Sequence, residues 1–186
     1  SNKAPGTFHH SLNVANIAET VANEIGANAM LVRVGALYHD IGKMSNPTYF
    51  TENQGSGINP HNDLDPVDSA RIIIDHTLNG IEIARKYNLP DRIIDFIRTH
   101  HGNSLVYYLY VKAKEENSDI AKDNFRYPGT KPFSQETDIL MIADSVEAAS
   151  KSIQNPTSIK IGALVNKIIE GQVDSGQFLN ANITFK

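Results

Sequence analysis

The stretch ALYHDIGK, residues 36–43, ends an apolar segment with a histidine, an aspartate and a lysine. The apolar segment 29–41 predicts a helix that stops at Gly42. Neighbouring residues on a helix point about 100° apart, so His39 and Asp40 cannot chelate one ion as a pair four residues apart can. They can flank a metal if the helix approaches it nearly end on, and a carboxylate can bridge two ions.

The rest of the chain has the pattern of helices separated by polar loops. Asp65-Pro66 and Ser134 are typical helix starts, and residues 43–63 and 123–133 have the composition of loops. No segment shows β alternation, so we predict a single all-α domain, a bundle of about seven to nine helices. The other expected helices are 7–25, capped by Thr7 and stopped by Gly26; 67–87, where Asn79-Gly80 favours a break; 92–101; 105–122; 135–152; 155–170; and a short one in the last fifteen residues.

The domain organisation is simple. Residues 1–6 are expected to be a tail or a remnant of cloning, and residues 7–186 to be one domain. We find no internal repeat and no linker, and 186 residues fit the usual size of one domain.

Composition excludes several classes of protein. Hydrophobic residues make up 40% and charged residues 20%, which is typical of a globular chain. The absence of cysteine excludes disulfides, thiolate zinc sites and a cysteine nucleophile. A net charge of −4 argues against binding to duplex nucleic acid, because such binding depends on many cationic side chains. No apolar run reaches the roughly 18 residues of a membrane span, and no signal segment is visible.

Histidines and aspartates recur in a particular order. Asp144 interrupts the apolar run 139–143, and a buried carboxylate is normally paired or bound to metal. Imidazole with carboxylate suits Mn, Fe, Zn, Co or Ni better than Ca or Mg. Each residue alone is more often structural; the set is informative because it lies on five expected helices. Its members are His10, His39, Asp40, His76, His100, His101 and Asp144.

This order resembles the HD-domain metal-dependent phosphohydrolases of the bimetallic subgroup, over about residues 7–172. The segment 39–43 matches the family's HD-x-G-K element, and His100-His101 matches the paired histidines of two-metal members. Residues 127–132 and 138–148 resemble, more closely, the intracellular domain of the seven-transmembrane-HD family. The related HD-GYP phosphodiesterases carry Gly-Tyr-Pro after the histidine pair. Here that stretch starts with Gly102-Asn103-Ser104, which argues against cyclic di-GMP as the substrate.

The resemblance implies a site and a reaction. His10, His39, Asp40 and Asp144 would hold one divalent ion, and Asp40, His76, His100 and His101 the other, with Asp40 bridging. The ions would be iron or manganese. A hydroxide shared by the metals would hydrolyse cyclic di-AMP to linear 5′-pApA. Asp40 and Lys43 are the catalytic candidates, and Lys43 would contact phosphate unless it is a solvated surface lysine. The parent protein would be membrane-anchored, with this domain in the cytoplasm; the oligomeric state stays open.

Other residues are weaker candidates. Arg126 and Tyr127 are expected to bind substrate phosphate and adenine, with loop packing as the alternative. His9 and His61 are expected to be surface residues, and segment 43–63 is either a lid or a surface insertion. The tyrosines of the 105–122 segment are expected in the core or at an interface; they are Tyr107, Tyr108 and Tyr110.

Three other functions compete with the leading one. An HD phosphohydrolase for cyclic di-GMP or a mononucleotide would share the metals and differ in its pocket. A catalytically inactive module that only binds a partner would lack some ligands, and none is missing here. A structural domain with incidental histidines would not place all seven residues in the family's order.

Overall fold

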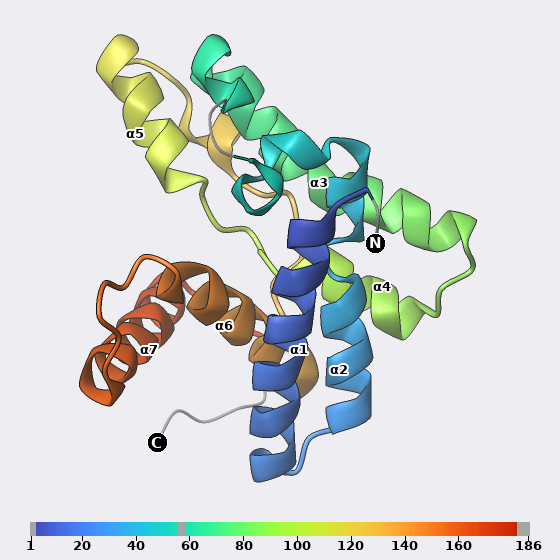
Figure 1. Ribbon diagram of the computed structural model, residues 1–186. Coiled ribbons are helices and arrows are strands. Elements are labelled where there is room, and N and C mark those ends of the chain that lie inside the picture. Colours follow the sequence, from blue (N-terminus) through green and yellow to red (C-terminus); the bar gives the residue numbers. More distant parts are fainter. Residues whose placement is uncertain (1–2, 56–58, 182–186) are drawn as a thin grey trace.

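Seven α-helices build the part of the chain that the structure, a computed structural model, describes: residues 3–55 and 59–181 (Figure 1). These residues contain no strand, only a single antiparallel bridge between Leu105 and Arg126. The all-α prediction is therefore confirmed. The helices are α1 (Pro5–Ile25), α2 (Ala29–Tyr38), α3 (Pro66–Lys86), α4 (Asp91–Thr99), α5 (Tyr107–Glu116), α6 (Gln135–Ser150) and α7 (Ser158–Asp174).

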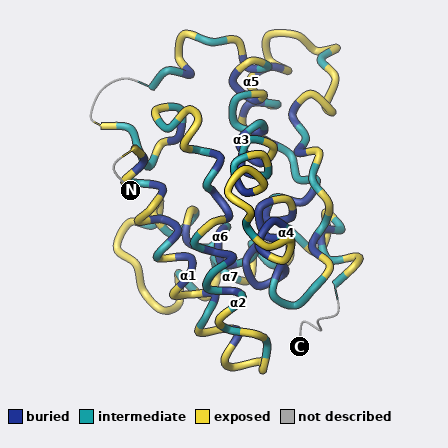
Figure 2. Tube along the Cα trace, turned by 90° about the vertical axis from the view of Figure 1, so that its right-hand side faces the viewer, coloured by how far each residue is buried: buried dark blue, intermediate teal, exposed yellow. Residues whose placement is uncertain are grey.

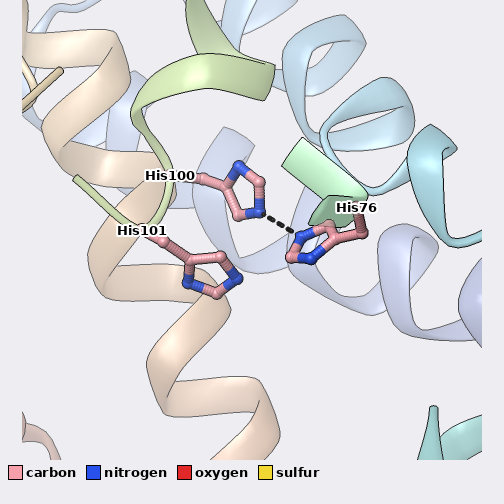
Figure 3. A group of neighbouring side chains, drawn as sticks. All are labelled: His76, His100 and His101. Atoms are coloured by element: carbon pink, nitrogen blue, oxygen red, sulfur yellow. Dashed lines mark hydrogen bonds between the residues drawn. The ribbon is translucent and has the colours of Figure 1, made fainter. Parts of the chain in front are cut away.

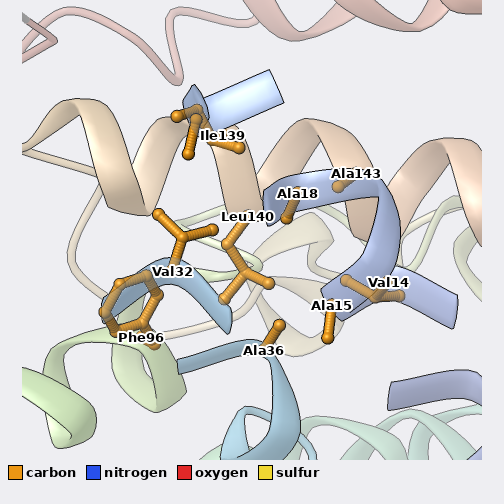
Figure 4. Packing of buried hydrophobic residues seen from close by; sticks show 10 residues of the cluster. Val14, Ala15, Ala18, Val32, Ala36, Phe96, Ile139, Leu140 and Ala143 are labelled. Carbon is orange, nitrogen blue, oxygen red and sulfur yellow. The ribbon is translucent and has the colours of Figure 1, made fainter. Parts of the chain in front are cut away.

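The main hydrophobic core lies between α1, α2, α4 and α6. Gly26, with a φ of 76°, ends α1 and lets α2 turn back along it. Small side chains on α1 allow a close approach of the neighbouring helices, and Gly35 of α2 leaves room for the ring of Phe96 of α4, which a Cβ would reach at 2.4 Å. The buried members, shown in Figure 4, include Val14, Ala15, Ala18, Val32, Ala36, Phe96, Ile139, Leu140 and Ala143.

A second cluster joins α5 to the N-terminal half of α3. Both elements extend away from the α1–α2–α6 body in Figure 1, and both contain buried as well as exposed residues, as the colours of the trace in Figure 2 show. Phe125 and Tyr127, on the connection between α5 and α6, complete this cluster with Ala70, Ile74, Leu109 and Ala113. The connection thereby returns to the centre of the molecule before α6 begins.

A contact between two glycines sets the position of the adjacent residues His39 and Asp40. Gly42, in the 3₁₀ helix η1 (Ile41–Ser45), lies against α3 so closely that a Cβ would come within 1.8 Å of the carbonyl oxygen of His76. On the facing side, a Cβ on Gly80 would lie 2.8 Å from Ile97 and 3.3 Å from the backbone nitrogen of Gly42. This contact holds Asp40, directly before η1, beside α3.

Several predicted helix boundaries were wrong. α1 begins at Pro5 after an Ala4 N-cap, so Thr7 is not the cap; proline at the first position suits a helix start. α2 ends at Tyr38, before the predicted stop at Gly42, and α3 runs unbroken through Asn79-Gly80. The predicted caps Asp65 and Ser134 are confirmed, the latter in a capping box.

The later boundaries also shift. α5 is shorter at both ends than the predicted helix 105–122, because Leu105 pairs with Arg126 and residue 117 is extended. α6 ends two residues earlier and α7 continues to Asp174, beyond the predicted end at Glu170. Residues 175–181 form turns rather than the expected short helix, whose remainder, 182–186, lies outside the described residues. No described helix is long and apolar enough to span a bilayer.

The described residues of segment 43–63, namely 43–55 and 59–63, lie mostly in short 3₁₀ turns rather than in an irregular loop. After η1 come η2 (Pro47–Tyr49), η3 (Thr51–Asn53) and η4 (Pro60–Asp63). His61 is buried, and its Nε2 donates to the carbonyl oxygen of Tyr49 at 2.9 Å. The prediction that His61 is a surface residue was wrong, because the turn of η4 places its ring against the ring of Tyr49.

Candidate metal centre

Five helices bring the predicted ligand residues to one place, which we call the seven-residue cluster. The residues lie mostly at helix ends, where the chain can turn two neighbouring side chains toward one point. All are buried except His101, which is half-buried. The cluster consists of His10 of α1, His39 at the C-cap of α2, Asp40 after it, His76 of α3, His100 at the C-cap of α4, His101 after it, and Asp144 of α6.

The cluster contains three groups with the spacing of metal ligands: two that share no residue, and a third, His39 with Asp40 and His100, that overlaps both. In each group the candidate ligand atoms lie within 4.8 Å of one another. The first, which we call the mixed group, consists of His10, His39 and Asp144. The second, the three-histidine group, consists of His76, His100 and His101, whose rings lie together in Figure 3.

Asp40 stands between the two groups and faces both. Its Oδ1 lies 3.3 Å from Nε2 of His76 and 3.6 Å from Nε2 of His100. Its Oδ2 lies 3.3 Å from Nε2 of His39 and 3.5 Å from Nε2 of His10. One carboxylate therefore presents one oxygen to each group, as a bridging ligand must.

The histidine rings are oriented by their other nitrogen. A carbonyl oxygen can only accept, so an Nδ1 that contacts one carries the proton, and Nε2 keeps its lone pair for a ligand. In three cases the acceptor is the backbone carbonyl three residues earlier, which fixes each ring against its own helix. The pairs are His39 with Ala36 at 2.7 Å, His100 with Ile97 at 2.8 Å, and His76 with Ile73.

The unpaired atoms of the cluster fit metal ions. Nε2 of His39 and Oδ1 of Asp40 are buried and make no hydrogen bond. Nε2 of His10 faces Oδ1 of Asp144 at 2.9 Å, and Oδ2 of Asp40 faces Nζ of Lys43 at 2.7 Å. Nε2 of His76 lies 3.1 Å from Nε2 of His100 (dashed in Figure 3), although both rings donate through Nδ1. Two lone pairs at that distance repel unless a cation or proton lies between them. Buried polar atoms left unsatisfied in this way are costly, and a bound ion removes the cost.

The charges of the mixed group and of Asp40 also favour a bound cation. Burial alone would raise the pKa of both carboxyls, yet His39 and Lys43 hold the pKa of Asp40, and His10 and His39 that of Asp144, well below the usual range. Burial alone would lower the pKa of His39, yet Asp40 and Asp144 raise it to about 10. Both carboxylates are therefore ionised, and their two negative charges suit a bound cation.

Glu147 is a site residue that the sequence analysis missed. It is buried on α6, and its Oε2 accepts from Nδ1 of His10 at 2.6 Å, while Oε1 accepts from Asn13 at 3.1 Å. Lys151 lies 2.9 Å from Oε2. Glu147 follows Asp144 by three residues, so both lie on one face of α6, and this spacing was the available signal. It orients the ring of His10 as the backbone carbonyls orient the others.

Lys43 is not a solvated surface lysine. Its Nζ lies 2.7 Å from Oδ2 of Asp40 and 2.9 Å from Oε1 of Glu52, and its side chain is 13% exposed. Glu52 belongs to η3, which is fixed to the start of α1 by hydrogen bonds from Thr7 to Glu52 and between Thr7 and Asn53. Lys43, Thr51 and Glu52 therefore form one wall of the site, and a surface insertion does not fit these described residues of segment 43–63.

Arg126 and Tyr127 have structural contacts. The guanidinium of Arg126 donates to the carbonyl oxygen of Asn103 at 2.8 Å, which ties the chain after α4 to the connection before α6. Tyr127 is buried and stacks on the ring of His101, with ring centroids 4.2 Å apart. The structure brings Tyr127 to the three-histidine group, whereas the contacts of Arg126 are with Asn103 and Asp123, outside the seven-residue cluster. Their substrate contacts stay predictions.

The tyrosines of α5 lie mostly outside the core. Tyr107 and Tyr108 are 67% and 61% exposed, so a core position was wrong for both. Tyr110 is partly buried and packs on Phe125.

An open cavity of about 590 Å³ gives access to the cluster. His10, His101 and Asp144 form its floor on the side of the two groups. Its other lining residues are Gly6, His9, Asn13, Lys43, Thr51, Glu52, Glu147, Ala148 and Lys151. His9 is exposed at this cavity, as a surface position predicts.

A helical bundle around a buried two-part histidine–aspartate site is the architecture of a metal-dependent hydrolytic domain. The HD domain family model matches residues 7–149, so the chain belongs to the HD domain family. HD domains depend on metal, and the seven-residue cluster supplies suitable ligands.

Relatives and solved structures agree with this membership. The chain is 50% identical over 184 residues to the cyclic-di-AMP phosphodiesterase PgpH of Listeria monocytogenes serotype 1/2a (strain 10403S), and 47% identical to PgpH of Bacillus subtilis (strain 168). Each alignment covers 99% of this chain and 26% of the relative, so the chain spans about a quarter of their length. The crystal structure of the L. monocytogenes PgpH HD domain in complex with cyclic-di-AMP superposes with a TM-score of 0.96, at 50% identity, over 98% of this chain and 86% of that one.

Proposed function

We propose that this chain is a two-metal phosphodiesterase that hydrolyses cyclic di-AMP to linear 5′-pApA. The observation that carries the proposal is the position of Asp40, which presents one oxygen to each ligand group. The similarity to proteins named cyclic-di-AMP phosphodiesterase, and to an HD domain crystallised with that nucleotide, supports the choice of substrate.

The chain's own residues would hold two ions and position the substrate. The mixed group with Asp40 would bind one ion, and the three-histidine group with Asp40 the other. When bound, such a pair of ions acidifies a water that both share and neutralises charge on the phosphate oxygens. Lys43 lies beside the bridging carboxylate and would direct its ammonium group to the same phosphate. Glu52 would keep the Lys43 side chain in that orientation.

The charges around the cavity explain why the reaction would need metal. Lys43 is paired with Glu52, and Lys151 with Glu147, so these pairs cancel. Asp40 and Asp144 carry two further negative charges and a protonated His39 offsets one, so the site stays negative and would repel a cyclic dinucleotide with two phosphates. Two divalent ions reverse the sign of the site and admit the anion.

We propose iron or manganese as the working ions. The donor atoms are imidazole nitrogens and carboxylate oxygens without any thiolate, a set that suits borderline transition metals. Metal analysis of protein purified without oxygen, followed by reloading with each ion, tests this choice. Iron or manganese should give the highest turnover per bound ion; zinc as the best cofactor would contradict the proposal.

The substrate is tested by turnover of cyclic di-AMP beside cyclic di-GMP, with Mn²⁺ returned to metal-stripped protein. Metal-dependent formation of 5′-pApA, much faster than cleavage of cyclic di-GMP, is the expected result. Protein that holds two ions and cleaves neither nucleotide would reject the substrate and favour a mononucleotide.

We also propose that residues 7–186 form one domain, on the cytoplasmic side of a membrane-anchored parent protein. The support is the longer length of the PgpH relatives, of which this chain covers 26%. Fractionation of the full-length parent protein tests the anchoring: recovery in the soluble fraction would contradict it.

A further inference from the structure

His101 is held differently from the other histidines of the seven-residue cluster. The other four rings each donate a hydrogen bond through Nδ1, that of His10 to Glu147 and the rest to backbone carbonyls. The ring of His101 makes no hydrogen bond within residues 3–55 and 59–181, and no dashed line reaches it in Figure 3. Its aim toward an ion must therefore come from packing and from the backbone around it.

Packing determines only part of that orientation. Tyr127 stacks on the His101 ring, with centroids 4.2 Å apart and an angle of 25° between the two planes. A stack restricts the tilt of a ring, but a stacked ring can still slide and turn within its own plane. Which nitrogen points at an ion, and from what distance, then depends on where the backbone places the Cα atom of His101.

Gln177 fixes the backbone that follows His101. Its Oε1 accepts from the backbone N–H of Asn103 at 3.3 Å, and its Nε2 donates to Oδ1 of Asn103 at 3.0 Å. Gln177 is 2% exposed, so little water competes for these bonds. Gly102 makes the approach possible, because a Cβ there would lie 2.3 Å from Oε1 of Gln177. Arg126 donates to the carbonyl oxygen of Asn103 at 2.8 Å, so three atoms of this one residue are held.

The end of α7 brings Gln177 to this loop. Gly176, with a φ of 69°, donates from its backbone N–H to the carbonyl oxygen of Val173 at 2.8 Å. The N–H of Gln177 donates to the carbonyl oxygen of Gln172 at 3.0 Å, and the two bonds together form a Schellman motif, which turns the chain back at a helix end. Gln177 lies outside residues 7–149, the part that the HD domain family model matches, so a later segment of the chain supports the site.

We propose that Gln177 is a positioning residue of the metal centre, which acts through Asn103 to aim the His101 ring at the ion of the three-histidine group. The inference rests on the two-ion site of the proposed function. Gln177 does not line the cavity beside the cluster, so its effect reaches the site only through the loop that it holds. Because the other two histidines of the group keep their own hydrogen bonds, loss of Gln177 should weaken binding of that ion without abolishing it.

Titration of metal-free protein with Mn²⁺, against a chromogenic chelator, tests this role. Gln177→Ala should weaken one of two sites about 10-fold, as loss of an outer partner of a ligand typically does. Combined with Glu147→Gln, which alters the partner of His10 in the mixed group, it should leave both sites weakened. Asn103→Asp keeps an oxygen that accepts from Nε2 of Gln177, and should keep the affinity of both sites.

The matched control is Gln172→Ala, also near the end of α7. The Gln172 amide joins α7 to α6, through the hydroxyl of Ser145 at 2.8 Å and the carbonyl oxygen of Met141 at 3.4 Å, and does not contact Asn103. Its loss should lower the stability of the protein, as loss of Gln177 does, and leave the three-histidine site at wild-type affinity.

The NMR signals of the His101 ring give a measurement that needs no metal. A ring stacked on Tyr127 has its proton signals shifted upfield by the ring current, and the spectrum of His101→Gln assigns them. In metal-free protein, Gln177→Ala should reduce this shift, whereas Gln172→Ala should keep it. If wild-type protein binds fewer than two ions or cleaves no cyclic di-AMP, the proposed function fails while the ring-current shift still tests Gln177.

Two results would overturn the role of Gln177. One is a Gln177→Ala protein with wild-type affinity for both ions and an unchanged His101 shift. The other is an equal loss in Gln172→Ala, which would mean that the end of α7 only stabilises the fold. Asn103→Ala removes just the bond to Nε2 from a partly exposed position, so it should reproduce part of the loss and decides the question if Gln177→Ala does not fold.

Discussion

At the scale of single residues, Glu147 shows how a side chain outside the ligand set can control a metal site. It bonds to Nδ1 of His10 at 2.6 Å, so His10 offers its Nε2 to the ion. Outer partners of this kind typically contribute about 10- to 100-fold in metal affinity. Glu147→Gln keeps the size of the side chain, and should weaken one of two Mn²⁺ sites about 10-fold in a titration against a chromogenic chelator.

The control for this variant is Glu170→Gln on the exposed face of α7, which should leave both affinities unchanged. Because the three-histidine group does not contact Glu147, the second site should keep its affinity in both variants. Equal weakening of the two sites would mean that Glu147 stabilises the fold rather than the ring of His10.

Asp138 makes the stability of the protein depend on pH. It is fully buried on α6, and neither carboxylate oxygen has a hydrogen-bond partner among the described residues. Burial, assisted by the charge of Glu136, raises its pKa to about 7, above an unfolded value near 3.9. Folding therefore favours the protonated form, so the stability is fully present below about pH 4 and is lost as the pH rises to about 7.

Asp138→Asn should remove this loss. The free energy of unfolding of the variant, relative to wild type, should rise by up to about 4 kcal/mol between pH 4 and pH 8 in urea titrations. Asp119→Asn, at an exposed position, should follow the wild-type curve. Parallel curves for Asp138→Asn and wild type would mean that the Asp138 carboxyl finds a partner in solution.

At the scale of elements, the contact between η1 and α3 joins His39 and Asp40 to His76. Gly80→Ala should force α3 and η1 apart, because the new Cβ would lie 2.8 Å from buried Ile97 and 3.3 Å from backbone of Gly42. We expect a loss of about 1–3 kcal/mol in unfolding free energy, as for other overpacked sites. Gly162→Ala on α7 meets nothing within 4 Å and should instead gain about 0.5–1 kcal/mol, since alanine favours a helix.

The contact between Gly42 and Gly80 also shows which features could not be predicted from the sequence. The helix starts at Asp65 and Ser134 were predictable, because a cap is a local pattern. The break expected at Asn79-Gly80 was wrong, because Gly80 allows the close approach of Gly42 rather than a turn of the chain. Gly42 lies 38 positions earlier, so no local pattern shows this contact. The ligand residues could be predicted from their order along the chain. The role of Glu147 could not, because its partner His10 is 137 residues away in the sequence.

At the scale of the whole molecule, the metal centre joins α3 to the four helices that share the main hydrophobic core, α1, α2, α4 and α6. Five helices contribute ligand residues to the cluster: α1, α3 and α6 from within the helix, and α2 and α4 from their C-terminal ends. Ion binding should therefore stabilise the complete fold. An ion present at 100 times its Kd adds about 2.7 kcal/mol to the stability of the native state. For a chain of this length each kcal/mol shifts Tm by about 2–4 °C.

Removal of metal should therefore lower Tm by roughly 5–10 °C for each ion lost, measured by calorimetry before and after chelation. Asp40→Asn should abolish most of this difference, because Asp40 alone serves both groups, while His76→Ala should keep about half of it by losing one ion. The stripped Asp40→Asn protein should be less stable than stripped wild type, since Lys43 and His39 lose the buried carboxylate that they pair with. A full chelation shift in Asp40→Asn would mean that each group holds its ion without the shared carboxylate, and the two-metal bridge would then have to be abandoned.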